Sequence, residues 1–310
     1  YIKNIYKYLI IFLKLITYKK NMINEKDINF FKENGYLIGK KVIDSPKKIE
    51  TLRKAVKDIL TGKRDFECNP YNLKRYKFTE GYKKNHSPEE IEYDINTELG
   101  KFDNGWWLNK EIRDLVFSKD IAKMAAKLMG VNSVRIWHDQ ILSKPPIENL
   151  NNNNKANIGW HQDRGYWTCC SKENMITAWL ALQDTNIDNG SMRFVKESNK
   201  WGLVSEGGDF FASDLEKLKA KLIKDGKKWL EISNDLKAGE VSFHDAFTFH
   251  GSGPNFSKKP RMSIALHLMP GDNTYNPSGT FHETAKALGP FAKKGTIFKE
   301  PFNPLIWSEE

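Results

Sequence analysis

The second half of the chain consists largely of short strand-like segments, and this constrains the fold more than any other feature. Beyond Val131, apolar, β-branched and aromatic residues gather in short runs that turn residues separate. Asn189-Gly190, between two such runs, is a dipeptide favoured in tight turns. We expect strands at residues 134–142, 176–182, 191–195, 240–243 and 262–269. This pattern predicts a mainly β fold.

Helical periodicity is confined to the first half of the chain and one later segment. Apolar residues recur there at helical spacing, with polar capping residues before them and glycine or asparagine after several of them. We expect helices at residues 25–33 and 49–60, between Ser118 and Gly130, and from a capping box at Ser213 to about Lys224. These helices are predicted to be scaffold that flanks the β core.

A candidate metal site begins in the sequence Trp160-His161-Gln162-Asp163. Side chains at positions i and i+2 of a strand share a face, so His161 and Asp163 would converge on one ion. A short apolar run then leads into a Gly/Pro-rich turn that begins at His250. Two imidazoles and one carboxylate on one face of an iron leave coordination positions open, as in non-heme Fe(II) oxygenases. We therefore expect these three residues to be metal ligands.

Arg261 points to a second component of the same site. It enters a mostly apolar strand, where a guanidinium is costly unless it meets an anion. A dicarboxylate bound to the iron by one end and to Arg261 by the other would supply that anion. Ser252 suits a hydroxyl donor beside the guanidinium, and Trp179 suits an aromatic wall.

Several motifs, taken in order, resemble the phytanoyl-CoA dioxygenase family of iron- and 2-oxoglutarate-dependent oxygenases. They are HDQILSKPP (138–146), WHQD (160–163), ITAW (176–179), DNGSMRFV (188–195) and HGSGPN (250–255). The likeness extends roughly from Met22 to Pro270. It implies a double-stranded β-helix, the cupin-like jelly-roll, with helices packed outside.

The resemblance also implies roles for individual residues. The three candidate ligands would hold Fe(II), while Arg261 and Ser252 would take the distal carboxylate of 2-oxoglutarate. Trp179, Gln140 and Lys101 would contact the same co-substrate. Two of these assignments remain open at this point, because Gln140 could face solvent on its strand and Lys101 could be an ordinary surface lysine.

The implied reaction consumes O2 and 2-oxoglutarate and hydroxylates an unactivated C–H bond of a small or lipid-derived molecule. An intact Asp163 favours hydroxylation, since halogenating relatives have a small residue at this position. Two alternatives remain. Zinc could occupy the same triad, although Arg261 and Trp179 would then have no task, and the chain could be a catalytically silent relative that serves as a binding or scaffold module.

Substrate selection is expected from loops over the mouth of the barrel. The candidates are the polar, mostly irregular residues 64–104, the stretch 207–211, and the aromatic pair Tyr166-Trp167, which could equally be core. His138 and His244 are each followed directly by an aspartate, which a strand would place on its opposite face. We therefore expect them, with His267, to play structural roles or to support the ligands.

Composition fits one enzyme domain over residues 22–310. The 49 basic and 39 acidic residues give a formal charge of +10, but the lysines are scattered, so we expect a small-molecule or acyl-type substrate and no nucleic-acid partner. Cys68 and the adjacent Cys169-Cys170 show neither zinc spacing nor an even-numbered disulfide framework. This favours a reducing compartment, the cytoplasm.

Residues 1–21 form a hydrophobic and basic extension. Its apolar stretch, from Tyr8 to Leu13, is interrupted at Lys14 and falls short of the roughly 20 apolar residues that a membrane span needs. A signal-anchor, an interfacial helix and a dispensable segment preceding Met22 all remain open. Membrane contact is expected only if this extension belongs to the working protein.

Overall fold

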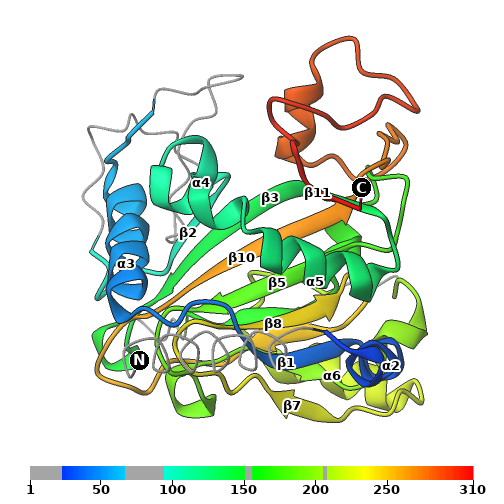
Figure 1. The fold of residues 1–310 in the computed structure, drawn as a ribbon. Helices are drawn as coiled ribbons and strands as arrows, with labels where there is room; N and C mark the ends of the chain where they lie inside the picture. Colours follow the sequence, from blue (N-terminus) through cyan, green and yellow to red (C-terminus); the bar gives the residue numbers. More distant parts are fainter. Residues whose placement is uncertain (1–22, 67–93, 151–155, 205–207, 310) are drawn as a thin grey trace, which may run out of the picture.

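The computed structural model describes residues 23–66, 94–150, 156–204 and 208–309. In this part of the chain, antiparallel strands form two sheets (Figure 1). The larger sheet has seven strands in the order β1-β8-β5-β10-β3-β11, with β2 also paired to β3, and the smaller has four in the order β4-β9-β6-β7. This is the predicted jelly-roll, and it is mainly β with flanking helices.

The bounds of the strands follow the apolar runs. The larger sheet contains β1 (Tyr36–Lys41), β2 (Gly100–Asp103), β3 (Ser133–Lys144), β5 (Ile176–Ala181), β8 (Glu240–Asp245), β10 (Arg261–Pro270) and β11 (Leu305–Ser308). The smaller contains β4 (Ile158–His161), β6 (Arg193–Val195), β7 (Glu231–Ser233) and β9 (His250–Ser252). Each predicted strand is present, although the one expected at 191–195 is shortened to β6.

Helices cover the outer face of the larger sheet (Figure 1). The α-helices are α2 (Glu25–Asn34), α3 (Pro46–Thr61), α4 (Lys110–Val116), α5 (Lys119–Met129) and α6 (Leu215–Lys224). Short 3-10 turns are η2 (Gly105–Trp107), η3 (Ile147–Asn149), η4 (Asp163–Tyr166), η5 (Ile187–Asn189), η6 (Ser198–Trp201) and η7 (Glu283–Leu288). Apolar side chains of α3, α4 and α5 form one buried cluster with the sheet.

Helix ends obey local chemistry, with one correction. Gly35 and Gly130 end α2 and α5 in the left-handed conformation, at φ 83° and 68°, which glycine adopts without strain. The capping box predicted at Ser213 is wrong by one residue. Asp214 is the N-cap of α6, because its carboxylate accepts hydrogen bonds from the backbone N–H groups of Glu216 and Lys217.

Strand β10 connects the core to the site. Its even-numbered residues, Met262 to Leu268, pack in the cluster under the helices, whereas Arg261, Ala265 and His267 line a cavity between the sheets. This alternation follows from the two-residue period of a strand. The whole strand is buried, so any polar side chain on its inner face needs a partner there.

Within the described ranges no helix is both long and apolar enough to cross a membrane. The extension at residues 1–21 lies outside these ranges. Membrane contact through it therefore stays a prediction.

Candidate metal centre and co-substrate pocket

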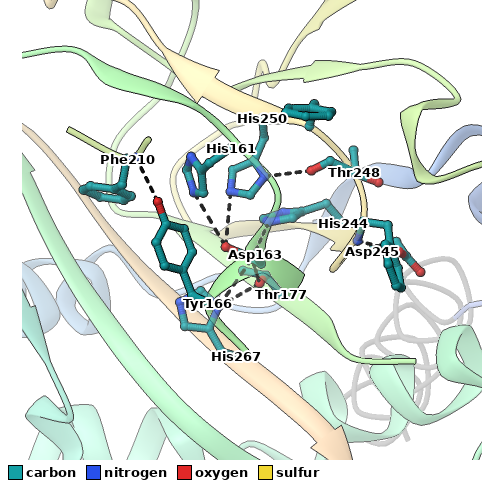
Figure 2. Close-up of polar contacts among 12 residues, drawn as sticks. His161, Asp163, Tyr166, Thr177, Phe210, His244, Asp245, Thr248, His250 and His267 are labelled. Carbon is teal, nitrogen blue, oxygen red and sulfur yellow. Dashed lines mark hydrogen bonds and ion pairs between the residues drawn. The ribbon is translucent and has the colours of Figure 1, made fainter. Parts of the chain in front are cut away.

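The three candidate ligands meet between the two sheets (Figure 2). His161 is the last residue of β4 and pairs in register with His250, the first residue of β9. The strand argument for Asp163 is wrong in one respect, because β4 ends at His161 and Asp163 begins the turn η4. The intervening Gln162 is extended, at φ −110° and ψ 125°, so the carboxylate still returns to the side of His161.

The geometry suits one metal ion. The Nε2 atoms of His161 and His250 each lie 3.6 Å from Oδ1 of Asp163. The three ligand atoms fall within 4.8 Å of one another, and all three residues are buried. Such a set fits an ion bound to all three atoms at once.

Hydrogen bonds fix both imidazoles in the tautomer that a metal requires. Nδ1 of His161 lies 2.7 Å from the carbonyl oxygen of Gly159, and Nδ1 of His250 lies 3.0 Å from that of Thr248. A carbonyl oxygen only accepts, so each Nδ1 carries the proton. Each Nε2 therefore directs a lone pair toward Asp163.

The carboxylate of Asp163 is held as firmly. Its Oδ2 accepts hydrogen bonds from the Thr177 hydroxyl at 2.7 Å and from Nε2–H of His244 at 3.2 Å, which leaves Oδ1 for a metal. Burial raises the pKa of Asp163, but the surrounding histidines, including the donor His244, outweigh it and hold that pKa well below the usual range. The carboxylate is therefore ionised.

Two of the remaining histidines are linked by hydrogen bonds to Asp163 or to its partner Thr177. His244 contacts Asp163, as described, and Nδ1 of His267 lies 2.7 Å from the Thr177 hydroxyl. The aspartate after His138 indeed faces away from it, since Asp139 accepts hydrogen bonds from the backbone N–H groups of Gly105 and Trp106.

Arg261 occupies the other end of the cavity. Its side chain is buried, with Nη1 donating to Ser263 at 3.0 Å and Nη2 to the carbonyl of Gly190 at 2.9 Å. The guanidinium carbon lies 5.5 Å from the centre of the Trp179 ring. Burial lowers the pKa of Arg261 to about 10, so it stays charged. No acidic side chain among the described residues pairs with it, and its Nε has no partner.

Lys144 is a second buried basic residue beside Arg261, and burial lowers its pKa well below the usual value. It pairs in register with Arg261 and has no exposed surface. Its Nζ donates to the Ser252 hydroxyl and to the carbonyl of Gly253, both at 2.6 Å. Ser252 thus accepts from Lys144, which leaves its own proton for a ligand. The two-residue period of a strand places Lys144 on the same face as Gln140.

One cavity of about 240 Å³ extends from the three candidate metal ligands to Arg261. Every candidate site residue from the sequence lines it, namely His161, Asp163, His250, Arg261, Ser252, Trp179, Gln140, Lys101, Tyr166 and Trp167. Lys101 is neither a free surface lysine nor an isolated cation, because it pairs with Asp103. Of the predicted substrate loops, Phe210 and Phe211 reach the cavity, while residues 67–93 lie outside the described part of the chain.

The two residues of the aromatic pair, Tyr166 and Trp167, make different kinds of contact. The Tyr166 hydroxyl accepts a hydrogen bond from the backbone N–H of Phe210 at 3.0 Å, so it anchors the segment that covers the cavity (Figure 2). Trp167 packs in a core cluster with Cys169 and Cys170 and also lines the cavity. Trp167 is therefore both a core residue and part of the cavity wall.

A jelly-roll that brings two histidines and an aspartate to one point, facing a buried arginine, defines a 2-oxoglutarate-dependent dioxygenase with iron as its metal. The model of the phytanoyl-CoA dioxygenase (PhyH) family matches residues 31–263. The match spans most of the chain, which therefore belongs to that family.

The relatives are distant in sequence, and their matches cover between half and most of this chain. Human peroxisomal phytanoyl-CoA dioxygenase is 21% identical over 268 residues, which cover 86% of this chain and 75% of the human protein. A probable alpha-ketoglutarate-dependent hypophosphite dioxygenase of Stutzerimonas stutzeri is 26% identical over 166 residues, half of this chain and 51% of its own length.

Solved structures agree on the fold. The alpha-ketoglutarate-dependent carbocyclase SnoK from nogalamycin biosynthesis superposes with a TM-score of 0.64 at 20% identity, covering 91% of this chain and 96% of its own. EctD from S. alaskensis, solved with 2-oxoglutarate and 5-hydroxyectoine, gives 0.60 at 19% identity, covering 90% and 89%. At these identities the likeness establishes the architecture alone.

Proposed function

We propose that this protein hydroxylates an unactivated C–H bond of a small or lipid-derived organic molecule, using Fe(II), 2-oxoglutarate and O2. The observation that carries the proposal is the pairing, in one cavity, of three convergent ligand atoms with a buried arginine that has no acidic partner among the described residues. When bound, iron and 2-oxoglutarate together supply an oxidant strong enough for an aliphatic C–H bond.

The protein orients the metal ligands. His161 and His250 present Nε2, because their Nδ1 protons are held by backbone carbonyls. Asp163 presents Oδ1, because Thr177 and His244 occupy its other oxygen. These contacts fix the rotation of each ligand before the metal arrives, which lowers the cost of binding it.

The opposite end of the cavity is built for a carboxylate. Lys144 and Arg261 are both buried, and the only acceptors that reach them in the described structure are neutral carbonyl and hydroxyl oxygens. Burial and the neighbouring charge of Arg261 lower the pKa of Lys144 well below its usual value, so an anion at this end of the cavity would stabilise positive charge on both groups. The distal carboxylate of 2-oxoglutarate would be that anion, accepting from Arg261 and from the Ser252 hydroxyl, with Trp179 beside it. Gln140 and Lys101 line the same space and would contact the co-substrate further in.

Hydroxylation is favoured over halogenation because Asp163 is intact and would itself bind the metal at the position that a halide would need. The substrate class is inferred from size and from the family. The cavity of about 240 Å³ has aromatic walls, including Tyr166 and Phe210, and two of the relatives are named phytanoyl-CoA dioxygenase. Tyr166 and Trp167 would contact the substrate and exclude water from the reacting atoms.

Metal and co-substrate binding provide the test. Anaerobic addition of Fe(II) and then 2-oxoglutarate should produce a visible charge-transfer absorption, and air should then release succinate faster when a substrate from a metabolite panel is present. Asp163→Ala should lose metal binding, whereas the surface variant Asp188→Ala should keep it. Full metal stoichiometry and turnover in Asp163→Ala would refute the ligand assignment.

Absence of any response to 2-oxoglutarate in well-folded, metal-loaded protein would instead favour the silent-relative alternative. Binding of zinc with hydrolysis in place of succinate release would favour the zinc alternative.

A further inference from the structure

Four histidines outside the candidate metal triad line the cavity, and one of them, His244, hydrogen-bonds to Asp163. The other three gather toward the end of β10 that lies away from Arg261. His138 on β3 and His267 on β10 are opposite each other in register, with ring centres 4.3 Å apart. His282, the N-cap of η7, lies with its ring centre 4.7 Å from that of His138. Roughly 20 Å of strand separates the Cα atoms of Arg261 and His267. The three imidazoles therefore lie at the other end of the strand from Arg261, where Nδ1 of His267 is 3.8 Å from Oδ2 of Asp163.

A bulge in β3 contributes to this arrangement. The pairing of β3 with β10 shifts between His267 and Leu268, so that Trp137 is an extra residue beside His138. Bulges re-aim side chains, and they are common beside active sites.

His138 offers a hydrogen-bond acceptor to the cavity. Its Nδ1 lies 3.3 Å from the carbonyl oxygen of Asp139, which can only accept, so Nδ1 carries the proton. Burial lowers the pKa of His138 to about 4, and the ring is neutral at physiological pH. Its Nε2 is buried and has no hydrogen-bond partner in the described structure.

His267 offers a second acceptor for a different reason. The Thr177 hydroxyl has one proton, which it donates to Asp163. It must therefore accept from Nδ1–H of His267, 2.7 Å away (Figure 2). Because Nδ1 donates its proton to Thr177, the ring presents Nε2 as an acceptor, and this atom too is buried without a partner in the described structure.

His282 has the opposite polarity. Its Nδ1 accepts a hydrogen bond from the backbone N–H of Thr284 at 3.2 Å, so the ring proton lies on Nε2. Burial lowers the pKa of His282 to about 3, which keeps this ring neutral as well. These three rings thus offer two acceptors and one donor.

We propose, building on the hydroxylase function above, that His138, His267 and His282 form a subsite for a hydroxyl group of the substrate, so that the enzyme acts on an alcohol. A hydroxyl donates one hydrogen bond, to Nε2 of His138 or His267, and accepts another from Nε2–H of His282. A carboxylate would bring only acceptors against two lone pairs, and an ammonium group could not accept from His282. A hydrocarbon would leave the buried nitrogens unpaired, which is costly.

The first experiment reads the tautomers in the unaltered protein. Nitrogen-15 NMR of histidine-labelled protein, loaded with Zn(II) as a diamagnetic substitute and with 2-oxoglutarate, reports which ring nitrogens carry protons. We expect Nε2 to be bare in His138 and His267 and protonated in His282. A protonated Nε2 in His138, or a bare one in His282, would overturn the proposal.

The second experiment compares three probes on one carbon skeleton, cyclohexanol, cyclohexylamine and cyclohexanecarboxylate, titrated into the same Zn(II) and 2-oxoglutarate complex. Cyclohexanol should bind best and shift the Nε2 resonance of His138. His138→Phe keeps the ring shape without the lone pair and should weaken cyclohexanol binding about tenfold, while His138→Gln, which places an amide oxygen near the same point, should recover much of it.

Equal or tighter binding of the amine or the carboxylate overturns the subsite, as does unchanged cyclohexanol binding in a folded His138→Phe protein. Calorimetry of 2-oxoglutarate binding, done first, separates the two proposals. If 2-oxoglutarate does not bind, the hydroxylase proposal fails, and if it binds while cyclohexanol does not reach His138, only the alcohol subsite fails.

Discussion

The Thr177 hydroxyl should matter to the metal even though it touches none. It donates to Oδ2 of Asp163 and accepts from Nδ1–H of His267, both at 2.7 Å. Thr177→Val has nearly the same shape and removes both hydrogen bonds. Asp163 then keeps only His244 on that oxygen, at 3.2 Å, and the carboxylate gains freedom to rotate away from His161 and His250.

The size of the effect follows from what each atom loses. A hydrogen bond to a charged group contributes about 1.5–3 kcal/mol, and a buried donor left unpaired costs about 1–3 kcal/mol. Part of this loss falls on overall stability, since both partners are buried in the absence of metal as well. The part specific to metal binding is the lost orientation of Asp163. Changes in groups that orient metal ligands typically cost 10- to 100-fold in metal affinity, and we expect that range here.

Anaerobic titration with Fe(II) or Co(II), monitored by absorption, measures the affinity, and thermal unfolding of the metal-free protein measures the stability. Thr185→Val is the matched control. It also removes a buried hydroxyl with two hydrogen bonds, to Asn234 and from Leu236, in a region outside the cavity lining. It should lower stability without weakening metal binding. Equal metal affinities for Thr177→Val and Thr185→Val would refute the argument that the hydroxyl orients Asp163.

The remaining predictions concern the co-substrate, the cover of the cavity and the response to pH. Arg261→Ala should raise the half-saturating concentration of 2-oxoglutarate about a hundredfold, because a buried charged contact is worth about 2–5 kcal/mol, and Arg261→Lys should recover part of it; an unchanged 2-oxoglutarate titration would mean that Lys144 or Lys101 holds the carboxylate. Tyr166→Phe frees the backbone N–H of Phe210 and should increase the 2-oxoglutarate consumed per product formed, and tight coupling in this variant would show that the hydroxyl does not secure the cover. His138 is neutral in the fold, with its pKa lowered by burial to about 4, so the stability it contributes is complete above pH 6.5 and is lost as pH falls from there toward 4. As pH is lowered from 6.5 to 4, the free energy of unfolding should therefore decrease about 1.4 kcal/mol per pH unit more steeply in the parent than in His138→Phe. Parallel curves of unfolding free energy against pH would contradict the burial of this ring.

Much of the site was predictable because its residues lie on regular strands. Arg261 begins a run, residues 261–268, in which large apolar residues alternate with polar or small ones, so the period of two is visible in the sequence. The placement of most candidate site residues on strands thus follows from local pattern together with the family motifs. The unusual feature of Arg261, a charge in an apolar strand, was informative because burial makes it costly.

Local pattern was insufficient where the chain leaves the strand geometry. Asp163 reaches the metal site from a 3-10 turn, and its position depends on Thr177 and His244 from the opposite sheet. Such cross-sheet hydrogen bonds join residues far apart in the chain, and no spacing rule reveals them. The edge strands β1, β2, β7 and β11 were missed for a related reason, because they are short and partly exposed, and their pairing depends on neighbours supplied by the fold.

His282 shows why substrate recognition was the least predictable part. It lies in an irregular segment after the last long strand, with nothing in its neighbours to distinguish it from a surface histidine. Its place in the cavity depends on η7 and on the backbone N–H of Thr284, which also fixes its tautomer. The jelly-roll positions metal and co-substrate by strand periodicity, which sequence retains. The wall that would face the substrate is assembled from a bulged strand and a terminal loop, whose hydrogen-bond polarity exists only once the chain has folded.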